Sequence, residues 1–266
     1  MPLTTLSQSC LQDYADCAQR FQLRWLEELA YPAIEAEPAL ENEQHALEGE
    51  RFHRLAQQSL LGIPPEKLTP LANTPNLQRW WEHFLAACLF PQPPQALYPE
   101  ISLSAPLPPY RLVAKFDLIA RLPDGNFLIY DWKTYRKRPR NEFLAIRWQT
   151  RVYRALLARA GHCLNQGQAI APEQITMVYW FADFPTESAF FPYTTAQYHR
   201  DWDALQTLAA EISSASAFPR TEDEQKCTWC IYRSYCNRGI QAGSGEPEEA
   251  DFQTEFDPEQ IGEIAF

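Results

Sequence analysis

Residues 114–135, AKFDLIARLPDGNFLIYDWKTY, carry the strongest structural pattern in this chain. Two runs rich in β-branched and aromatic residues flank Pro-Asp-Gly at residues 123–125, a sequence typical of a β-hairpin turn. Side chains two apart in a strand share a face, so Asp131 and Lys133 project together, and the hairpin brings Asp117 across from the neighbouring strand. A carboxylate and an amine on a mostly apolar strand are costly to cover unless they are paired or bind an ion. The hairpin therefore predicts core strands with a polar centre.

Helical patterns surround this hairpin on both sides. Residues 11–25 carry apolar side chains at spacings of three and four, with Ser7 or Ser9 as the cap, and residues 31–47 are Pro- and Glu-rich and predict a loop. We expect further helices at residues 45–62, 76–90, 143–161 and 195–214, and further strands at residues 96–103, 174–181 and 188–193. The sequence predicts an α/β protein with a small central mixed sheet, flanking helices and a helical elaboration over about residues 27–95.

Length and composition fit one soluble unit. The 266 residues are 45% hydrophobic, enough for one substantial core and too few for several full domains. The first residues, MPLTTLSQSC, lack a basic segment followed by an apolar run, and nowhere do about 18 apolar residues run uninterrupted. We expect a single domain over residues 1–240 and an acidic, disordered tail over residues 241–266, in a soluble cytoplasmic protein.

The net charge of -11 hides an uneven distribution. Of the 34 acidic residues, 16 lie in two stretches, 27–50 and 241–266, that contain no Lys or Arg. The rest of the chain holds 18 acidic residues against 23 Lys and Arg, a net charge of about +5. The acidic total therefore does not exclude a nucleic-acid partner.

The polar centre of the hairpin has the composition of a hard-cation site. Asp117 and Asp131 offer carboxylate oxygens, the ligands that Mg²⁺ and Mn²⁺ prefer. Such an ion holds phosphoryl oxygens and lowers the pKa of a bound water, while Lys133 orients that water or neutralises developing charge. Taken alone, an Asp-X-Lys sequence more often forms a salt bridge at a strand end. The surrounding sequence is therefore needed to choose between a salt bridge and a metal site.

Four further segments give the hairpin a context. GERFHRL at residues 49–55 precedes it, QTRVYRALL at residues 149–157 follows it, and SCLQDYADCAQRFQLRWL at residues 9–26 and CTWCIYRSYC at residues 227–236 lie toward the two ends. Together with the hairpin, these segments resemble the RecB-like branch of the PD-(D/E)XK nuclease superfamily, including its CRISPR-associated exonuclease-like members that carry an iron-sulfur cluster. The resemblance covers most of residues 7–238 and implies a restriction-endonuclease-like core.

The resemblance also implies roles for individual residues. It implies metal binding by His53, Asp117 and Asp131. It implies catalytic roles for Asp117, Asp131, Lys133, Gln149 and Tyr153. Gln149 and Tyr153 are four residues apart, so they lie on one face of the predicted helix.

Two positions near the hairpin leave questions open. Glu100 is either a further residue beside the metal or a surface charge at a strand end. Ala114 is a departure from the family pattern, which has glycine three residues before the Asp, so close backbone packing there is altered. Neither position removes a catalytic group.

Seven cysteines without an export signal favour metal ligation by reduced thiolates over disulfides. Cys227, Cys230 and Cys236 form a C-x2-C-x5-C pattern that needs a fourth thiolate from elsewhere. Cys10 and Cys17, seven residues apart on a predicted helix and hence on a similar face, both offer one. From spacing alone, Zn²⁺ and an iron-sulfur cluster are alternatives, and free thiols are a third.

The resemblance selects Cys17 as the fourth ligand and implies a [4Fe-4S] cluster. This cluster would join about residues 10–20 to residues 227–236, a connection called the cysteine clasp below. Zn²⁺ remains the alternative at the same four thiolates. In either case the role of the clasp would be mainly structural.

The segment directly after Lys133 is basic. Beside a phosphodiesterase centre, its cations would bind backbone phosphates without sequence preference; they are Arg136, Lys137, Arg138 and Arg140. A basic run elsewhere is usually a solvated loop. Tyr135, Trp132 and Trp148 are candidates for stacking on single-stranded bases, although most aromatic residues of the chain are expected in the core.

These features together predict a divalent-metal-dependent deoxyribonuclease. As the family implies, it would be an exonuclease or flap-type enzyme on single-stranded DNA, in repair, recombination or CRISPR-related processing. No helicase segment is found in the sequence, so a helicase or other DNA-processing protein is the expected partner, and no membrane partner is expected. The alternatives are a catalytically silent DNA-binding or scaffold protein with the same fold, and a zinc-stabilised interaction module.

Overall fold

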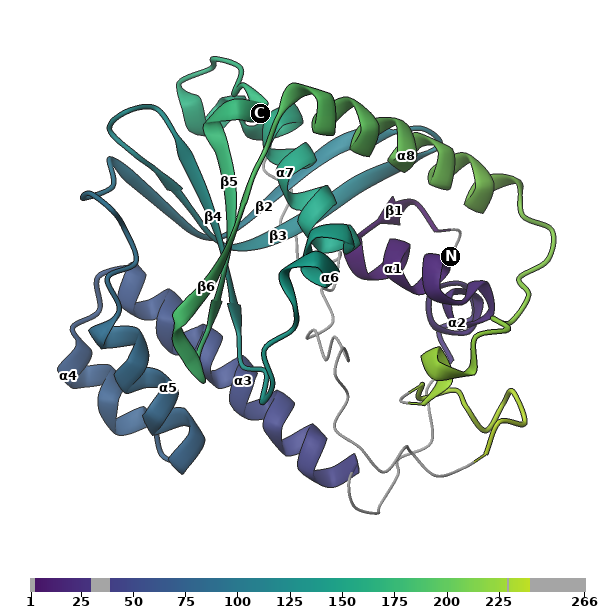
Figure 1. The fold of residues 1–266 in the computed structure, drawn as a ribbon, viewed down its shortest axis with the longest axis horizontal. Helices are drawn as coiled ribbons and strands as arrows, with labels where there is room; N and C mark the ends of the chain where they lie inside the picture. The colour runs from purple at the N-terminus through teal and green to yellow at the C-terminus, as the bar shows by residue number, and fades with distance from the viewer. Residues whose placement is uncertain (1–2, 30–38, 229, 240–266) are drawn as a thin grey trace.

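A mixed six-stranded sheet forms the centre of the computed structural model, which describes residues 3–29, 39–228 and 230–239 (Figure 1). Its strands are β1 (Thr5–Leu6), β2 (Ala96–Leu107), β3 (Tyr110–Arg121), β4 (Phe127–Lys133), β5 (Ile175–Phe181) and β6 (Phe184–Pro192). The order is β1-β3-β4-β5-β6, with β2 along the other edge of β3. The pairs β1–β3 and β4–β5 are parallel and the others antiparallel, which confirms the predicted mixed sheet.

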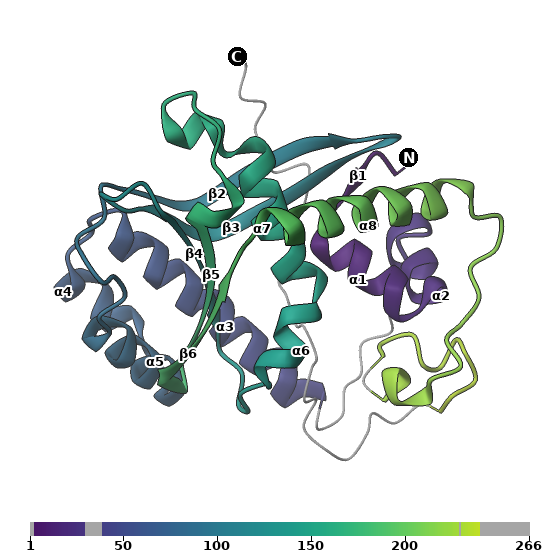
Figure 2. The same ribbon diagram turned by 45° about the horizontal axis from the view of Figure 1, so that its top comes forward.

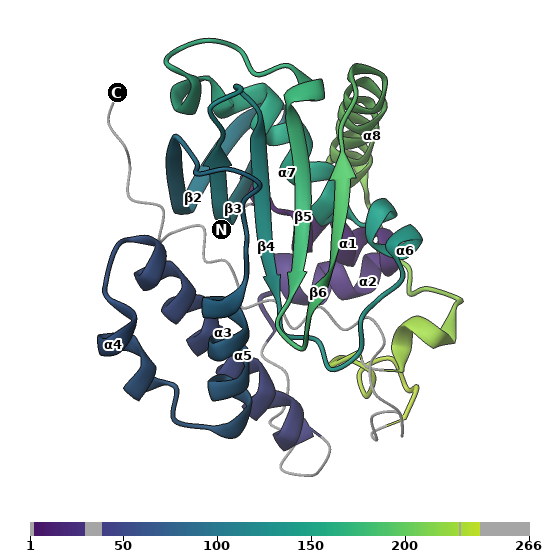
Figure 3. The same cartoon turned by 60° about the vertical axis from the view of Figure 1, so that its left-hand side comes forward.

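Helices cover both faces of this sheet. They are α1 (Gln8–Asp16), α2 (Ala18–Phe21), α3 (Ala39–Leu60), α4 (Pro65–Leu68), α5 (Pro75–Ala86), α6 (Asn141–Ile146), α7 (Trp148–Ala160) and α8 (Thr195–Ser214). Short turns add a π-helix at Gln22–Leu26 and 3-10 helices at Thr69–Leu71, Gly161–Asn165, Pro172–Gln174 and Glu224–Cys227. Figure 3 shows α3, α4 and α5 on one side of the sheet, and α1, α7 and α8 on the other. Among the described residues, no helix is long and apolar enough to cross a bilayer.

Apolar side chains fill two cores, one on each face of the sheet. The α7-side core contains Ile129 of β4 packed with Leu156 of α7. The α3-side core contains Trp132 of β4 with Phe52 of α3 and Trp80 of α5. The side chains of neighbouring β4 residues pack in opposite cores because strand side chains alternate in direction. Asp131 therefore shares the α7 side with Ile129.

The opening helix is shorter than its apolar spacing predicts. Ser7 caps α1 by accepting the Cys10 N–H at 3.3 Å, but α1 ends at Asp16. Cys17 is extended, with φ -163 and ψ 108, and α2 and the π-helical turn follow it. The expectation that Cys10 and Cys17 share a helix face is therefore wrong. Cys10 is 1% exposed in the α7-side core, whereas Cys17 is half-buried outside it.

Other helix boundaries also differ from expectation. Helix α3 begins at Ala39, so part of the predicted loop over residues 31–47 is helical, because Ala, Leu, Glu and Gln there are strong helix formers. The predicted helix over residues 143–161 is interrupted at Arg147, whose ψ of 144 is extended, so α6 and α7 are separate. The predicted disordered tail at residues 241–266 lies outside the described residues.

Candidate active site

Asp117 lies where β3 changes the face that its side chains present. Phe116 packs in the α7-side core, whereas Leu118 packs in the α3-side core. Strict alternation would keep these two residues on one face, so the strand turns over at Asp117. The matching position of β2 is Glu100, which lies between the pairs Pro99↔Leu118 and Ile101↔Phe116 and has a left-handed φ of 55. A non-glycine residue in this conformation persists where its surroundings hold it there.

This irregularity accompanies a cluster of three potential metal ligands. One atom each from His53 of α3, Glu100 of β2 and Asp117 of β3 lie within 4.8 Å of one another, and we call them the ligand cluster. His53 Nδ1 lies 3.3 Å from Asp117 Oδ1, and Asp117 Oδ2 accepts a 2.8 Å hydrogen bond from the backbone N–H of Trp132. Glu100 Oε2 also lies 2.6 Å from Lys115 Nζ. The sequence left Glu100 open between two roles, and the structure places it beside Asp117.

Asp131 and Lys133 form an adjoining group with Gln149 of α7, the lysine cluster. Lys133 Nζ lies 2.9 Å from Asp131 Oδ2 and donates to Gln149 Oε1 at 2.9 Å. Gln149 Nε2 donates to Asp131 Oδ1 at 2.6 Å, which closes a ring of polar contacts. All three residues are buried, with exposed fractions of 3% to 6%. Asp131 and Lys133 point to the same side, as their spacing predicts, but Asp131 is not one of the three members of the ligand cluster.

Two residues that sequence reasoning missed support the lysine cluster. Tyr179 of β5 lies opposite Asp131 in the parallel register, and its hydroxyl donates to Gln149 Oε1 at 3.4 Å. The same hydroxyl shares a 2.8 Å hydrogen bond with Thr150 Oγ1. Both elements carry a further hydroxyl residue, Tyr153 on α7 and Thr176 on β5, so no signal in the sequence singled out this pair. Only the folded chain shows that they meet.

Tyr153 makes a backbone contact near the site. Its hydroxyl donates to the Lys115 carbonyl at 2.8 Å and accepts a hydrogen bond from Gln8 Nε2 at 3.4 Å. Lys115 lies between the β3 residues that pair with β1, ending at Leu112, and those that pair with β4, beginning at Leu118. Within the described residues, no strand covers that edge of β3 in between. Tyr153 therefore helps to hold β3 in place just before Asp117.

Burial and crowded carboxylates shift the acid-base equilibria of the site. Burial alone would lower the pKa of His53, but neighbouring carboxylates, Asp117 first, outweigh it and raise the pKa to about 9. Burial raises the pKa of Asp131 to about 6 against the opposing effect of Lys133. Although burial acts to raise the pKa of Asp117, His53 and the Trp132 N–H hold it below its usual value. In the metal-free protein the neighbouring carboxylates thus stabilise a proton on His53. A divalent cation bound at the same carboxylates can replace this proton.

The basic run after β4 places three cations at the surface. Arg136, Lys137 and Arg140 are exposed. Arg138 instead donates to the Glu187 carbonyl at 2.8 Å and to Asn141 Oδ1 at 2.7 Å. Its guanidinium also lies over the Phe181 ring at 5.2 Å. Arg138 is therefore better placed to fix this loop against β6 than to bind phosphate.

The stacking role considered for two tryptophans is wrong. Trp132 is 2% exposed and lies in the α3-side core, and Trp148 is 9% exposed and packs in the α7-side core. A buried indole cannot stack on a base that arrives from solvent. Tyr135 is half-buried beside Lys133, whose Nζ lies 5.5 Å from the ring centroid.

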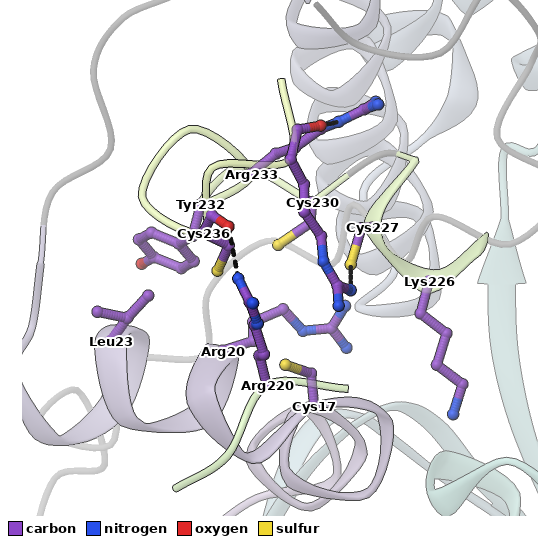
Figure 4. Close-up of a pocket in the computed structure, with 11 residues that line it drawn as sticks. Cys17, Arg20, Leu23, Arg220, Lys226, Cys227, Cys230, Tyr232, Arg233 and Cys236 are labelled. Atoms are coloured by element: carbon purple, nitrogen blue, oxygen red, sulfur yellow. Dashed lines mark hydrogen bonds between the residues drawn. The ribbon is translucent and has the colours of Figure 1, made fainter. Parts of the chain in front are cut away.

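The four cysteines assigned to the clasp line one pocket (Figure 4). Cys17 comes from the break between α1 and α2, and Cys227, Cys230 and Cys236 come from the C-terminal segment. Among the described residues, no three thiols have sulfur atoms within 4.8 Å of one another. A tetrahedral zinc site with Zn–S bonds of about 2.3 Å needs sulfur atoms roughly 3.8 Å apart. The thiols thus share a pocket without reaching zinc geometry.

Cationic side chains surround these thiols. The pocket is lined by Arg20, Arg220, Lys226, Arg233 and Arg238 as well as by the cysteines. Arg238 Nη1 donates to Cys227 Sγ at 2.9 Å, and the Thr221 N–H donates to Cys17 Sγ at 3.4 Å. Burial raises the pKa of the Cys230 and Cys236 thiols, although the nearby arginines act to lower it. The same cations would offset the negative charge of a thiolate-bound centre.

Comparison with known proteins places this architecture in a family. The sequence matches the model of the PD-(D/E)XK nuclease superfamily over residues 5–237. The chain belongs to this superfamily. No curated protein sequence matches the chain. The family match identifies the mixed sheet and its flanking helices as a restriction-endonuclease-like core, in a class of nucleases that act on nucleic acid and typically use a divalent metal.

Two solved structures are similar to this PD-(D/E)XK chain. A candidate exonuclease from Eubacterium rectale aligns with a TM-score of 0.54 and 11% identity, covering 91% of each chain. The crystal structure of SSO0001 aligns with a TM-score of 0.42 and 14% identity, covering 90% of this chain and 88% of the other. At 11% identity, the likeness to the Eubacterium rectale protein shows the fold alone.

Proposed function

We propose that this chain is a divalent-metal-dependent deoxyribonuclease of the RecB-like branch, which cleaves single-stranded DNA from free ends or at flaps. The observation that carries the proposal is that the β3–β4 hairpin of a PD-(D/E)XK core brings Asp117 of the ligand cluster beside Asp131 and Lys133 of the lysine cluster. The similar protein from Eubacterium rectale, described as a candidate exonuclease, supports the choice of exonuclease. An intact lysine cluster argues against a catalytically silent scaffold.

The donor set fits a hard divalent cation such as Mg²⁺ or Mn²⁺. Asp117 and Glu100 offer carboxylate oxygens and His53 offers an imidazole nitrogen within 4.8 Å of one another. Asp131 is the further ligand that the family pattern implies. Both of its oxygens already have partners, but a carboxylate oxygen has two acceptor sites, so Asp131 can contact the ion as well.

Phosphodiester hydrolysis needs a positioned water and a group that stabilises negative charge. When bound, a divalent ion supplies Lewis acidity toward a phosphoryl oxygen and lowers the pKa of water. Lys133 is held by Asp131 and Gln149 in a buried position, where its ammonium orients the water or neutralises the charge that develops on phosphate. Gln149 fixes the relative position of the acid and the amine through both ends of its amide.

The exposed cations after β4 are proposed to bind the DNA backbone. Arg136, Lys137 and Arg140 follow directly on the strand that ends with Lys133. Contacts of this kind give affinity without sequence preference and weaken as the salt concentration rises. Such an activity would serve repair, recombination or CRISPR-related processing. Its partner would be a helicase or another DNA-processing protein.

The cysteine clasp is proposed to hold a [4Fe-4S] cluster through Cys17, Cys227, Cys230 and Cys236, within a single nuclease domain over residues 1–240. The chemistry of four thiols in a cationic pocket supports this assignment. Zn²⁺ at the same four thiolates is the alternative.

Digestion of end-labelled DNA tests the proposed activity. The wild type should cut single-stranded DNA with Mg²⁺ or Mn²⁺, and Asp131→Ala and Lys133→Ala should each reduce the rate by about 100-fold or more, because transition-state charge is no longer stabilised. Double-stranded DNA and RNA of the same sequence measure substrate preference.

Matched substitutions control for nonspecific effects of the changes. Asp203→Ala on α8 and Lys67→Ala on α4 remove the same kinds of side chain at exposed positions, and both variants should cut like the wild type. The proposal fails if the wild type cuts neither DNA substrate, or if both cluster variants cut as fast as their controls.

A further inference from the structure

Helix α1 connects the active site to the cysteine segment through a row of polar side chains. Gln8, Gln12 and Asp16 are spaced by four residues and therefore share one face of the helix. Figures 1 and 2 show α1 beside α6 and α7, with the C-terminal segment near its far end. Each of the three side chains contacts a different part of the molecule. Gln8 donates to the Tyr153 hydroxyl at 3.4 Å.

Gln12 supplies the cap that the first turn of α7 lacks within its own sequence. Arg147, at the N-cap position, makes no side-chain capping hydrogen bond. Gln12 Oε1 instead accepts the Trp148 N–H at 3.2 Å. The next residue, Gln149, holds both Asp131 and Lys133. Because a free N–H at a helix start costs free energy, the cap also stabilises the turn that carries Gln149.

A hydrogen bond to Asp16 fixes the orientation of the Gln12 amide. Gln12 Nε2 donates to Asp16 Oδ2 at 3.1 Å, which directs its oxygen toward α7. Asp16 also accepts a 3.1 Å hydrogen bond from Arg20 and lies 3.3 Å from Lys226 Nζ. Lys226 directly precedes Cys227 of the clasp. A short chain of contacts thus runs from the thiol pocket to the first turn of α7.

We propose that Gln12 is a positioning residue for the nuclease centre and that Asp16 links it to the cysteine segment. Without the hydrogen bond from Trp148 to Gln12, the first turn of α7 can move. Gln149 then no longer holds Asp131 and Lys133 in their relative positions. A displacement of about 1 Å in such a support costs up to roughly 100-fold in rate. The catalytic part rests on the proposed function, whereas the mechanical link does not.

The mechanical link is tested by amide hydrogen exchange, detected by NMR at the Trp148 N–H. Gln12→Ala should raise the exchange rate of this amide about tenfold or more, because its acceptor is gone. Gln12→Glu keeps an acceptor oxygen and should retain most of the protection. Gln206→Ala, at an exposed position of α8, is the matched control and should exchange like the wild type. Equal Trp148 exchange in the wild type and Gln12→Ala overturns the proposal.

Kinetics test the positioning role with the same variants. Gln12→Ala should lower kcat about tenfold with KM within about twofold, and Gln12→Glu should recover most of the loss. A wild type that cuts DNA together with an unchanged kcat in Gln12→Ala overturns the positioning role and leaves the proposed nuclease intact. If the wild type cuts nothing, the proposed function fails, and the exchange result alone decides the link.

The connection to the clasp has its own test. Cys230→Ala should raise Trp148 exchange relative to amides of α8 in the same sample, which correct for a general loss of stability. Cys163→Ala, an exposed thiol on the 3-10 turn after α7, is the matched control. A rise at α8 equal to that at Trp148 overturns the link between the clasp and α7.

Discussion

The ionisable groups at the site lie close enough to shift one another's pKa values. Three carboxylates, Glu100, Asp117 and Asp131, lie near one imidazole and two ammonium groups. The folded pKa of His53, about 9, stands above its ordinary value of 6.5. The stability that its proton contributes is therefore complete below pH 6.5 and is lost as the pH rises through 9. Asp131 acts in the same direction between its ordinary value of 3.8 and about 6.

In metal-free protein, the free energy of unfolding should fall as the pH rises from 6.5 to about 9. The expected loss is roughly 1–2 kcal/mol, because the His53 side chain is 30% exposed and solvent screens its interactions. Urea denaturation in EDTA at several pH values measures it. His53→Gln should remove this slope, and His199→Gln, at an exposed position of α8, should keep it. The same slope in both variants would show that His53 is not the group that titrates.

At the scale of elements, the position of α3 relative to β4 determines where His53 lies. A Cβ added at Gly49 would come within 2.8 Å of Thr134 Oγ1, just after the end of β4. His45 Nε2 lies 2.7 Å from the Thr134 carbonyl. His45, Gly49 and His53 are spaced by four residues, so one face of α3 contacts the end of the hairpin and the site together. The close approach at Gly49 therefore positions the His53 ligand.

Gly49→Leu should move α3 away from Thr134 and displace His53. Overpacking at such a contact lowers stability by about 1–3 kcal/mol, and the affinity for Mn²⁺ should fall about tenfold. Calorimetric titration with Mn²⁺ and urea denaturation measure the two effects. Glu50→Leu, at the exposed neighbouring position, is the control. Unchanged Mn²⁺ affinity in a destabilised Gly49→Leu protein would mean that this contact does not position His53.

At the scale of the whole molecule, segments from the two ends of the chain meet beside the nuclease core. The Tyr232 hydroxyl donates to the Leu29 carbonyl at 2.9 Å, and Phe218 packs on Phe21 with ring centroids 5.8 Å apart. The thiol pocket lies in the same region and takes residues from both segments (Figure 4). A metal centre in this pocket would close a loop of more than two hundred residues, so its loss should affect the stability of the whole fold.

Cys230→Ala should lower the melting temperature by about 5 °C or more and reduce visible absorption at the same time. Anaerobically purified protein is analysed for iron and zinc alongside its visible spectrum. Iron with visible absorption fits a [4Fe-4S] cluster, and zinc without colour fits the alternative ion. Cys163→Ala should change neither property. A melting temperature and spectrum that stay the same in Cys230→Ala would contradict the clasp.

Local sequence patterns were enough to predict the hairpin, the shared side of Asp131 and Lys133, and the superfamily. The reason is that turn chemistry and strand alternation are local, so Pro-Asp-Gly and a spacing of two suffice. Local patterns also predicted that Gln149 and Tyr153 come from one helix, because helical periodicity is local as well. These features need no knowledge of which distant segments meet.

The groups that surround that hairpin could be identified only from the folded chain. The left-handed φ of Glu100, the burial of Trp132 and the hydrogen bonds of Arg138 depend on segments far apart in the chain. The break at Cys17 follows no helical period, and it separates Cys10 in the core from Cys17 in the thiol pocket. Contacts of this kind arise from packing and strand twist, which propensity and spacing do not encode.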